Sequence, residues 1–168
     1  KLKGGVVGTL MTNLAFEEGC KKFEIPFLRS NVGDRYVSEL LYEKNWMLGG
    51  ENSGHILITN KHSTGDGIIS ALQVLNSILE AKQSIEEALK SIPMYPQILI
   101  NLPLTKKVDL TSSVMERAIN DAKLIMENKG RILIRESGTQ PLIRVMTEGP
   151  DKEKAIKAAE FLIEKIKY

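Results

Sequence analysis

Aromatic side chains and cysteine are scarce in this sequence. Only 5% of its 168 residues are Phe, Trp or Tyr, so a buried core must be built mainly from aliphatic side chains. With Cys20 as the single cysteine, the chain cannot form an intramolecular disulfide. This fits a reducing compartment, and we expect a cytoplasmic protein with Cys20 buried in a short helix.

Long apolar runs and a large excess of one charge are also missing. No run approaches the ~20 apolar residues of a membrane-spanning helix, so we expect no membrane partner. Lys and Arg number 23 against 21 Asp and Glu, which gives a formal net charge of +2. The lysines are spread along the chain apart from the pair Lys106–Lys107. We therefore expect no nucleic-acid partner.

Metal-binding motifs are absent as well. His55 and His62 are the two histidines, and no Cys-x-x-Cys or His-x-x-x-His spacing is present, so we expect no metal site in this sequence. The sequence opens on Lys1 and enters a strand-like run almost at once. From this we expect a piece of a longer protein.

Strand and helix signals alternate in the first half of the chain. We expect strands at Gly5–Met11, Phe23–Leu28, Trp46–Gly50 and His55–Asn60, and helices at Asn13–Lys22, Asp34–Lys44 and Ile68–Ala81. Asp66 is expected to cap the last of these helices. The apolar stripe of that helix is Ile68, Leu72, Leu75 and Leu79. The pattern predicts a mixed α/β domain with three layers over residues 1–92.

Two prolines, Pro93 and Pro96, interrupt the pattern, and we place a domain boundary between residues 92 and 93. We expect strands at Ile98–Leu104, Arg131–Ile134 and Leu142–Thr147, and a last helix after Pro150. Another helix is expected between the first two strands, with a capping box formed by Ser113 and Glu116 and an end at Gly130. Residues 93–168 are thus predicted to form a small α+β domain, a short antiparallel sheet covered by two helices, similar to the TATA-binding protein fold.

Two arginines flank small polar residues in the segment Arg135-Glu-Ser-Gly-Thr-Gln-Pro-Leu-Ile-Arg144. Arginine pairs with a phosphate through two parallel hydrogen bonds and stays charged. Ser137 and Thr139 add hydroxyl donors, and Gly138 allows backbone N–H groups to form an anion nest. Glu136 can point away from Arg135 because neighbours in a strand alternate faces. The segment indicates a phosphate-binding loop, with a polar hairpin in surface ion pairs as the open alternative.

A glycine-flanked turn, Gly49-Gly-Glu-Asn-Ser-Gly-His55, is the second candidate site. In extended geometry Glu51 and Ser53 share one face, where a carboxylate and a hydroxyl can hold two vicinal hydroxyls of a sugar. Asn52 can instead face the backbone, and a simple hairpin turn is the alternative for the whole segment. Asp34 and Arg35 can begin a helix or reach the same cleft.

These segments resemble one family, the α-D-phosphohexomutases. Arg135–Glu148 is similar to their C-terminal phosphate-binding loop, and Gly50–His55 resembles their sugar-binding loop. Val7–Asn13, Val32–Val37 and Thr64–Ile68 resemble the phosphoglucosamine mutase branch in particular. The similarity runs over nearly the whole chain in the right order.

This resemblance implies an isomerase with four domains. A phosphoserine in the first domain would exchange a phosphoryl group with a hexosamine phosphate. The reaction would interconvert glucosamine 6-phosphate and glucosamine 1-phosphate through glucosamine 1,6-bisphosphate. It would lie on the route to UDP-N-acetylglucosamine and peptidoglycan. Residues 1–92 would be the third domain, which recognises the sugar, and residues 93–168 the fourth, which binds the phosphate. The implied sugar-binding residues are Glu51, Asn52 and Ser53, and the implied phosphate-binding residues are Arg135, Ser137, Gly138, Thr139 and Arg144.

Two of the family's motifs are not found. There is no Ser-His-Asn-Pro-type loop for the phosphoserine and no Asp-x-Asp-x-Asp-type loop for Mg²⁺, so we expect this chain alone to be inactive and to depend on N-terminal domains of the same protein. The full-length family member can form a homodimer. Asp34, Arg35 and His55 are candidates for acid–base roles.

One position departs from the family pattern. Gln140 stands where the family usually has glutamate, which removes a charge but no donor, so we expect phosphate binding to survive. Two other functions remain open, a sugar-phosphate-binding module without catalysis and a mutase for glucose or mannose phosphates.

Overall fold

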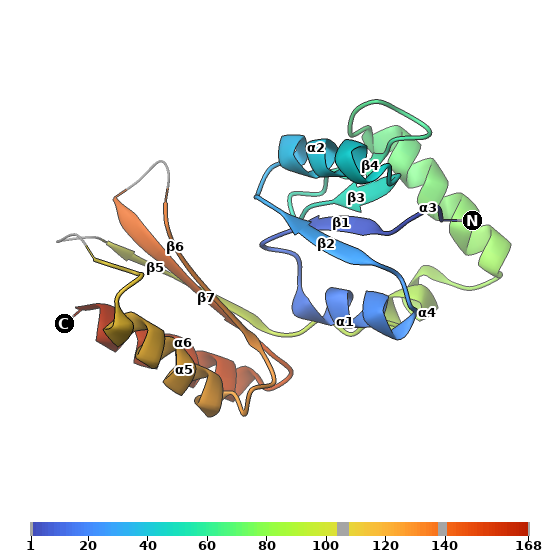
Figure 1. Cartoon of the computed structure of the whole chain (residues 1–168). Helices are drawn as coiled ribbons and strands as arrows, with labels where there is room; N and C mark the ends of the chain where they lie inside the picture. The colour runs from blue at the N-terminus through green and yellow to red at the C-terminus, as the bar shows by residue number, and fades with distance from the viewer. Residues whose placement is uncertain (1, 104–107, 138–140, 168) are drawn as a thin grey trace. The chain divides into compact units, whose positions relative to one another are not determined.

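The computed structural model describes residues 2–103, 108–137 and 141–167, and it divides into two compact units, Lys1–Pro93 and Met94–Tyr168 (Figure 1). The boundary expected from the two prolines lies between residues 92 and 93. Among the described residues, no helix has both the length and the apolar character needed to cross a membrane.

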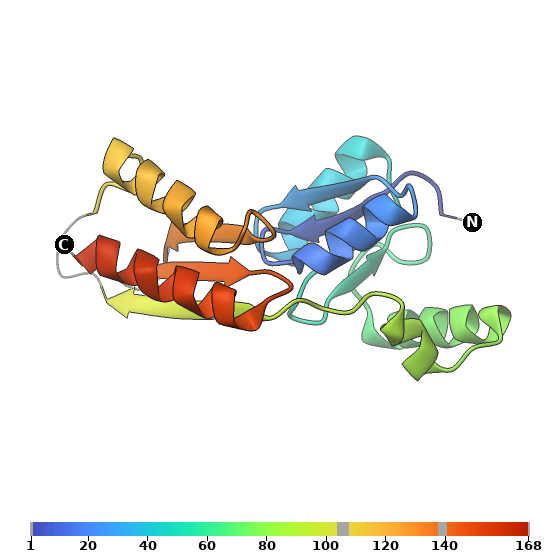
Figure 2. The ribbon, with the colours of Figure 1, turned by 90° about the horizontal axis from the view of Figure 1, so that it is seen from below.

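The first unit contains a mixed sheet with the strand order β2-β1-β3-β4. β1 runs parallel to β2 and β3, and β4 is antiparallel to β3. The strands are β1 (Val6–Thr9), β2 (Phe27–Ser30), β3 (Leu48–Gly50) and β4 (Ile56–Ile58). The helices are α1 (Leu14–Lys22), α2 (Asp34–Lys44), α3 (Gly67–Ala81) and α4 (Ile85–Lys90). Figures 1 and 2 place α1 and α2 on opposite faces of the sheet, which gives the predicted three layers.

The second strand begins later than the sequence predicts. Phe23 is the C-cap of α1 and not the start of a strand, and Glu24 follows with a positive φ of 56°. The N–H of Ile25 still reaches back to the carbonyl of Cys20, 2.8 Å away. These helix-terminating bonds occupy the residues up to Ile25, so the strand starts only at Phe27.

The core of the first unit is small and lies beneath α2. Its fully buried members are Val7, Val37, Leu41 and Leu57. Cys20 is also buried, as expected. The apolar stripe of α3 does not join this core, because Ile68 and Leu79 are 75% and 76% exposed.

The second unit is an antiparallel sheet with the order β5-β7-β6 and two helices, α5 (Ser113–Ile125) and α6 (Lys152–Lys167), on one face (Figure 2). The strands are β5 (Gln97–Pro103), β6 (Arg131–Glu136) and β7 (Leu142–Glu148). This is the predicted α+β architecture. Its core joins α5, α6 and β7 through Met115, Ala118, Ala122, Met126, Ile143, Val145, Ala158, Leu162 and Ile166.

Both ends of α5 differ from the prediction. Ser112, not Ser113, is the N-cap, and its side chain accepts a hydrogen bond from the N–H of Met115. The helix ends at Ile125 rather than at Gly130, because Glu127 and Asn128 adopt positive φ angles. A capping box does occur in α4, where it is formed by Ser84 and Glu87.

Candidate functional site

The β6–β7 hairpin pairs two arginine residues across the strands. Arg135 on β6 lies directly opposite Arg144 on β7. Like charges in directly opposed positions of a sheet repel each other and destabilise the pair. The hairpin is closed beyond them by a 2.8 Å hydrogen bond from the Ser137 N–H to the Leu142 carbonyl. The strand register therefore concentrates positive charge at one end of the sheet.

The Nε atom of Arg144 makes this concentration unusual. It is buried, and within the described ranges it has no hydrogen-bond partner. A buried donor without a partner costs free energy, and the cost is larger when the group is charged. An anion bound between Arg135 and Arg144 would supply the missing acceptor and offset the repulsion between the two side chains.

The acidic residue in this segment lies on the other face of the sheet. Glu136 pairs with Ile143, which belongs to the core beneath the helices. Because side chains alternate along a strand, Glu136 is directed to the helix side and Arg135 to the opposite side. Glu136 therefore does not oppose an anion bound at the arginines. Gly138, Thr139 and Gln140 lie outside the described residues.

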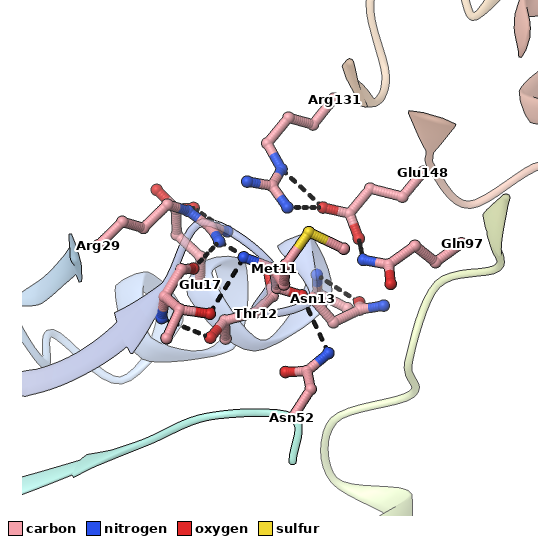
Figure 3. Close-up of polar contacts among 11 residues, drawn as sticks. Met11, Thr12, Asn13, Glu17, Arg29, Asn52, Gln97, Arg131 and Glu148 are labelled. Atoms are coloured by element: carbon pink, nitrogen blue, oxygen red, sulfur yellow. Dashed lines mark hydrogen bonds and ion pairs between the residues drawn. The ribbon is translucent and has the colours of Figure 1, made fainter. Parts of the chain in front are cut away.

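A second arginine on β6 is neutralised within the unit. Glu148 is fully buried, and its Oε1 accepts hydrogen bonds from Nε and Nη2 of Arg131 at 2.7 and 2.6 Å (Figure 3). The Glu148 Oε2 accepts from the amide of Gln97 at 2.9 Å. Through these bonds to Arg131 and Gln97, the Glu148 carboxylate links β5, β6 and β7 at the end of the sheet away from Arg135 and Arg144. Its role is structural, since both oxygens of the carboxylate are occupied.

The turn after β3 forms a compact polar cluster in the first unit. The Ser53 hydroxyl donates to Glu51 Oε1 over 2.6 Å, and His55 Nδ1 lies 2.8 Å from the Ser53 oxygen and 3.2 Å from Glu51 Oε1. The Gly33 N–H donates to Glu51 Oε2 over 3.1 Å. Gly54 closes the turn with a φ of 94°, in the left-handed region that favours glycine. Glu51 and Ser53 therefore do meet on one side, beside the start of α2.

Exposure distinguishes the members of this cluster. The side chain of Glu51 is 9% exposed, whereas that of His55 is 52% exposed. A carboxylate fixed by a backbone N–H and a hydroxyl keeps a constant orientation and retains lone pairs for further donors. This is the arrangement needed to accept hydrogen bonds from hydroxyl groups of a ligand.

Asn52 points away from this cluster. Its amide donates to the carbonyl of Met11 over 3.0 Å, which ties the turn to the loop between β1 and α1 (Figure 3). The backbone-facing orientation that the sequence left open is thus the one adopted.

The other acid–base candidates engage their own helix. Gly33 is the N-cap of α2, with a φ of 130°, and Asp34 is its first residue. Asp34 Oδ1 accepts from the N–H of Arg35 over 2.8 Å. Arg35 is exposed and pairs with Glu39 at 2.7 Å, and this hydrogen bond and the Glu39 charge raise the pKa of Arg35. The structure thus brings His55, but not the side chain of Arg35, to the Glu51 cluster.

Sequence reasoning did not single out Arg29, which organises the β1–α1 loop. Its Nη1 donates to the carbonyls of Thr9 and Thr12 at 2.8 and 2.6 Å. Its Nε and Nη2 donate to Oε2 of Glu17 at 2.9 and 2.7 Å (Figure 3). The loop held in this way contains Met11, the partner of Asn52. The sequence signal that could have drawn attention to this loop is the polar Thr-Asn end of the segment Val7–Asn13, directly after a buried strand.

Metal ligands do not cluster in the part of the chain that the structure describes. No group of three or more His, Cys, Asp or Glu side chains there is arranged to hold an ion.

Two family models match the chain one after the other. Residues 1–95 match the model of phosphoglucomutase/phosphomannomutase, alpha/beta/alpha domain III. Residues 99–165 match the model of the phosphoglucomutase/phosphomannomutase C-terminal domain.

The curated relatives are similar over almost all of this chain. The phosphoglucosamine mutase of Nitrosospira multiformis is 52% identical over 167 residues, which is 99% of this chain. That of Methylobacillus flagellatus is 52% identical over 95% of the chain, and that of Mannheimia succiniciproducens is 49% identical over 99%. The chain spans 36% of the first two relatives and 38% of the third.

Solved structures share the fold at low sequence identity. A crystal structure of Aspergillus fumigatus N-acetylphosphoglucosamine mutase, in complex with GlcNAc-6P and magnesium, matches with a TM-score of 0.78 and 19% identity. It covers 98% of this chain, which corresponds to 42% of that chain. Another structure of the A. fumigatus enzyme matches with a TM-score of 0.80 and 20% identity over 97% of this chain and 38% of that one.

Proposed function

This chain belongs to the phosphoglucomutase/phosphomannomutase family, and from that premise we propose that it is the ligand-binding C-terminal part of a phosphoglucosamine mutase. The full-length protein would interconvert glucosamine 6-phosphate and glucosamine 1-phosphate through a phosphoserine and a bisphosphate intermediate. The names of the relatives that are about half identical to this chain support the choice of a hexosamine phosphate. A cytoplasmic location fits that substrate.

The observation that carries the proposal is the arginine pair on the β6–β7 hairpin. Arg135 and Arg144 are directly opposed, and the buried Nε of Arg144 lacks a partner among the described residues. A phosphate dianion offers several acceptor oxygens and matches two adjacent guanidinium groups. Ser137, and Gly138 and Thr139 beyond the described residues, would add further donors. This hairpin would hold the phosphate that does not react.

The Glu51 cluster would recognise the sugar. Its carboxylate is held by the Gly33 N–H and the Ser53 hydroxyl and can accept hydrogen bonds from sugar hydroxyls. Asn52 would act by fixing the turn through Met11 rather than by touching the ligand. Binding of the phosphate at the hairpin and of the sugar at the Glu51 cluster would position the reacting oxygen. This raises the reaction rate because the geometry is set before the chemical step.

Catalysis would depend on parts of the protein outside this chain. No group of metal ligands exists in the described ranges, so the Mg²⁺ of the family enzyme would be held by other domains, where it would stabilise charge on the transferred phosphoryl group. The phosphoserine would also lie there. This chain alone would therefore bind a sugar phosphate without turning it over.

The test is a titration of the ¹⁵N-labelled chain with glucosamine 6-phosphate, glucose 6-phosphate, inorganic phosphate and a short DNA duplex. We expect glucosamine 6-phosphate to shift the amide of Ser137. It should also shift the amide of Gly33, because the Gly33 N–H is hydrogen-bonded to Glu51. Inorganic phosphate should shift the hairpin amides alone. An Arg144→Met variant should lose the hairpin response, whereas Lys129→Met, which removes an exposed charge from the same unit, should keep it.

Different failures of this experiment have different meanings. Shifts at lysine-rich surfaces with DNA, and none at either loop with millimolar sugar phosphate, would refute the proposed function. An equal response to glucose 6-phosphate would agree with phosphate binding by the hairpin but would contradict the choice of a hexosamine substrate.

A further inference from the structure

Helix α3 directs its most apolar side into solvent. The exposed fractions are 75% for Ile68, 58% for Leu72, 50% for Leu75 and 76% for Leu79. We call these four residues the α3 face. In this helix, all of which the structure describes, Ser70 is the one buried residue. Its hydroxyl donates to the carbonyl of Ile56 on β4 over 3.3 Å. A small polar residue is thus turned inward while the large aliphatic side chains are left outside.

The chemistry of the α3 face restricts what can cover it. No charged residue occurs between Gly67 and Leu79, so this stretch of the helix carries no cation to attract a nucleic acid or an anionic lipid headgroup. A helix this apolar is normally enclosed in a core. The next helix, α4, adds Ile85 and Leu89, which are 53% and 70% exposed. Exposed apolar side chains gathered in this way are typical of a protein–protein contact.

The length of the family members identifies an occupant. Domains III and IV match this chain, and the chain spans only 36–38% of the relatives, so most of each relative's polypeptide lies outside the match. Domain III is described as alpha/beta/alpha. In the first unit α2 covers the core-bearing face of the sheet, while Ile56 on β4, next to α3, is still 37% exposed. α3 therefore does not fully cover the strand next to it.

We propose that the α3 face is the docking surface for the polypeptide that precedes this chain in the full-length protein, and that this polypeptide contributes an apolar helix that packs against Leu72 and Leu75. The proposal rests on family membership and on the exposure of α3, and it is independent of whether the two loops bind a sugar phosphate. It also explains why a helix with an intact N-cap at Asp66 carries so little buried surface.

Thiol labelling tests this contact directly. Leu72→Cys introduces a reactive thiol on the α3 face, and Leu124→Cys is the matched control on α5, since Leu124 is 64% exposed. The native Cys20 is buried and reacts slowly, so it adds little background. Both variants are made in the 168-residue chain and in a chimera in which this chain replaces the matched part of the Nitrosospira multiformis enzyme. Mutase activity of the chimera establishes that it is assembled.

In the isolated chain we expect both introduced thiols to react at similar rates. In the chimera the Leu72→Cys thiol should react at least about tenfold more slowly, while Leu124→Cys is unchanged. If the chimera does not fold, the same substitution at the aligned position of the Nitrosospira enzyme itself gives the measurement. Equal Leu72→Cys rates with and without the preceding polypeptide would overturn the proposal. Protection that appears in the isolated chain and grows with its concentration would also overturn it, because the occupant would then be a second copy.

Discussion

At the scale of single residues, the most informative feature is a buried arginine nitrogen without a hydrogen-bond partner among the described residues. Arg144 sits on the central strand of the second unit, directly opposite Arg135, with a buried Nε that lacks an acceptor in the described part of the chain. By contrast, Arg131, four residues before Arg135 on β6, is paired with Glu148. Arg131 thus holds the strands together through Glu148, whereas Arg144 is the arginine that we propose binds the phosphate.

Replacing Arg144 with methionine should therefore separate binding from stability. Arg144→Met keeps an extended apolar stem but removes the charged donors. Because a charged hydrogen bond contributes about 1.5–3 kcal/mol, phosphate affinity should fall by roughly tenfold or more. The melting temperature without ligand should stay equal or rise, because the repulsion with Arg135 is removed. Calorimetric titration and thermal melts measure both quantities. Loss of stability without loss of affinity would contradict this assignment.

Cys20 gives a prediction about pH. Burial, and secondarily the charge of Glu17, raises the pKa of the Cys20 thiol above its ordinary value of 9.0. The folded state therefore holds this proton more tightly than the unfolded state. Its contribution to stability is complete below pH 9.0 and is lost as the pH rises from there through the raised pKa.

Urea unfolding between pH 7 and 10.5 measures this effect. The free energy of unfolding of the wild type should fall more steeply above pH 9 than that of Cys20→Ala, which has no thiol to titrate. The difference between the two proteins cancels the titration of tyrosines and lysines. Parallel curves would show that Cys20 titrates normally in the folded chain.

At the scale of secondary structure, the helices follow from local signals more closely than the strands do. α2 begins and ends where its helical spacing predicts, whereas the second strand starts at Phe27, four residues after the predicted position. α4 was not predicted, although its Ser84 and Glu87 form the capping box that marks such starts. With only six residues, α4 is too short for a periodic pattern to be recognised.

The N-cap of α3 is a local signal whose strength can be measured. As the sequence predicts, Asp66 Oδ1 accepts hydrogen bonds from the N–H groups of Ile68 and Ile69, both at 2.9 Å. Asp66→Ala should lower the free energy of unfolding by about 1 kcal/mol and reduce the helical circular dichroism signal. Asp66→Asn should retain most of both, because asparagine caps equally well. An alanine variant with unchanged helicity would mean that the cap does not hold α3 in solution.

At the scale of the whole chain, the two units differ in how much core each possesses. The second unit joins both helices to β7 through a cluster of nine buried residues, whereas the cluster beneath α2 in the first unit has four. The first unit also leaves the α3 face exposed. Because burial of apolar surface is the main favourable term in folding, the second unit should be the more stable when each is studied alone.

This difference predicts how the separate units behave. Expressed alone, residues 94–168 should unfold cooperatively on heating. Residues 1–93 should melt at a lower temperature and bind a hydrophobic dye, because their apolar helix has no cover. Circular dichroism melts and dye fluorescence measure both. A disordered 94–168 fragment, or a 1–93 fragment that melts higher and binds no dye, would contradict this order of stability.

Apart from α4, the sequence by itself determined the kinds of elements and their order, and it singled out the two candidate ligand-binding segments. Helical and strand periodicity, caps and turn glycines act over a few neighbouring residues, so they can be read without the fold. The resemblance of Arg135–Glu148 and Gly50–His55 to the phosphohexomutases is likewise a property of local sequence.

Only the tertiary structure decided which of these residues meet. Arg135 faces Arg144 because of the β6–β7 register, and Glu51 receives the N–H of Gly33 from eighteen residues away. Arg29 reaches the β1–α1 loop from the neighbouring strand. The exposure of the α3 face is also a tertiary property, since its stripe looks like any core-facing helix. The physical reason is that register, burial and long-range hydrogen bonds depend on how strands pair and helices pack, and no local propensity specifies them.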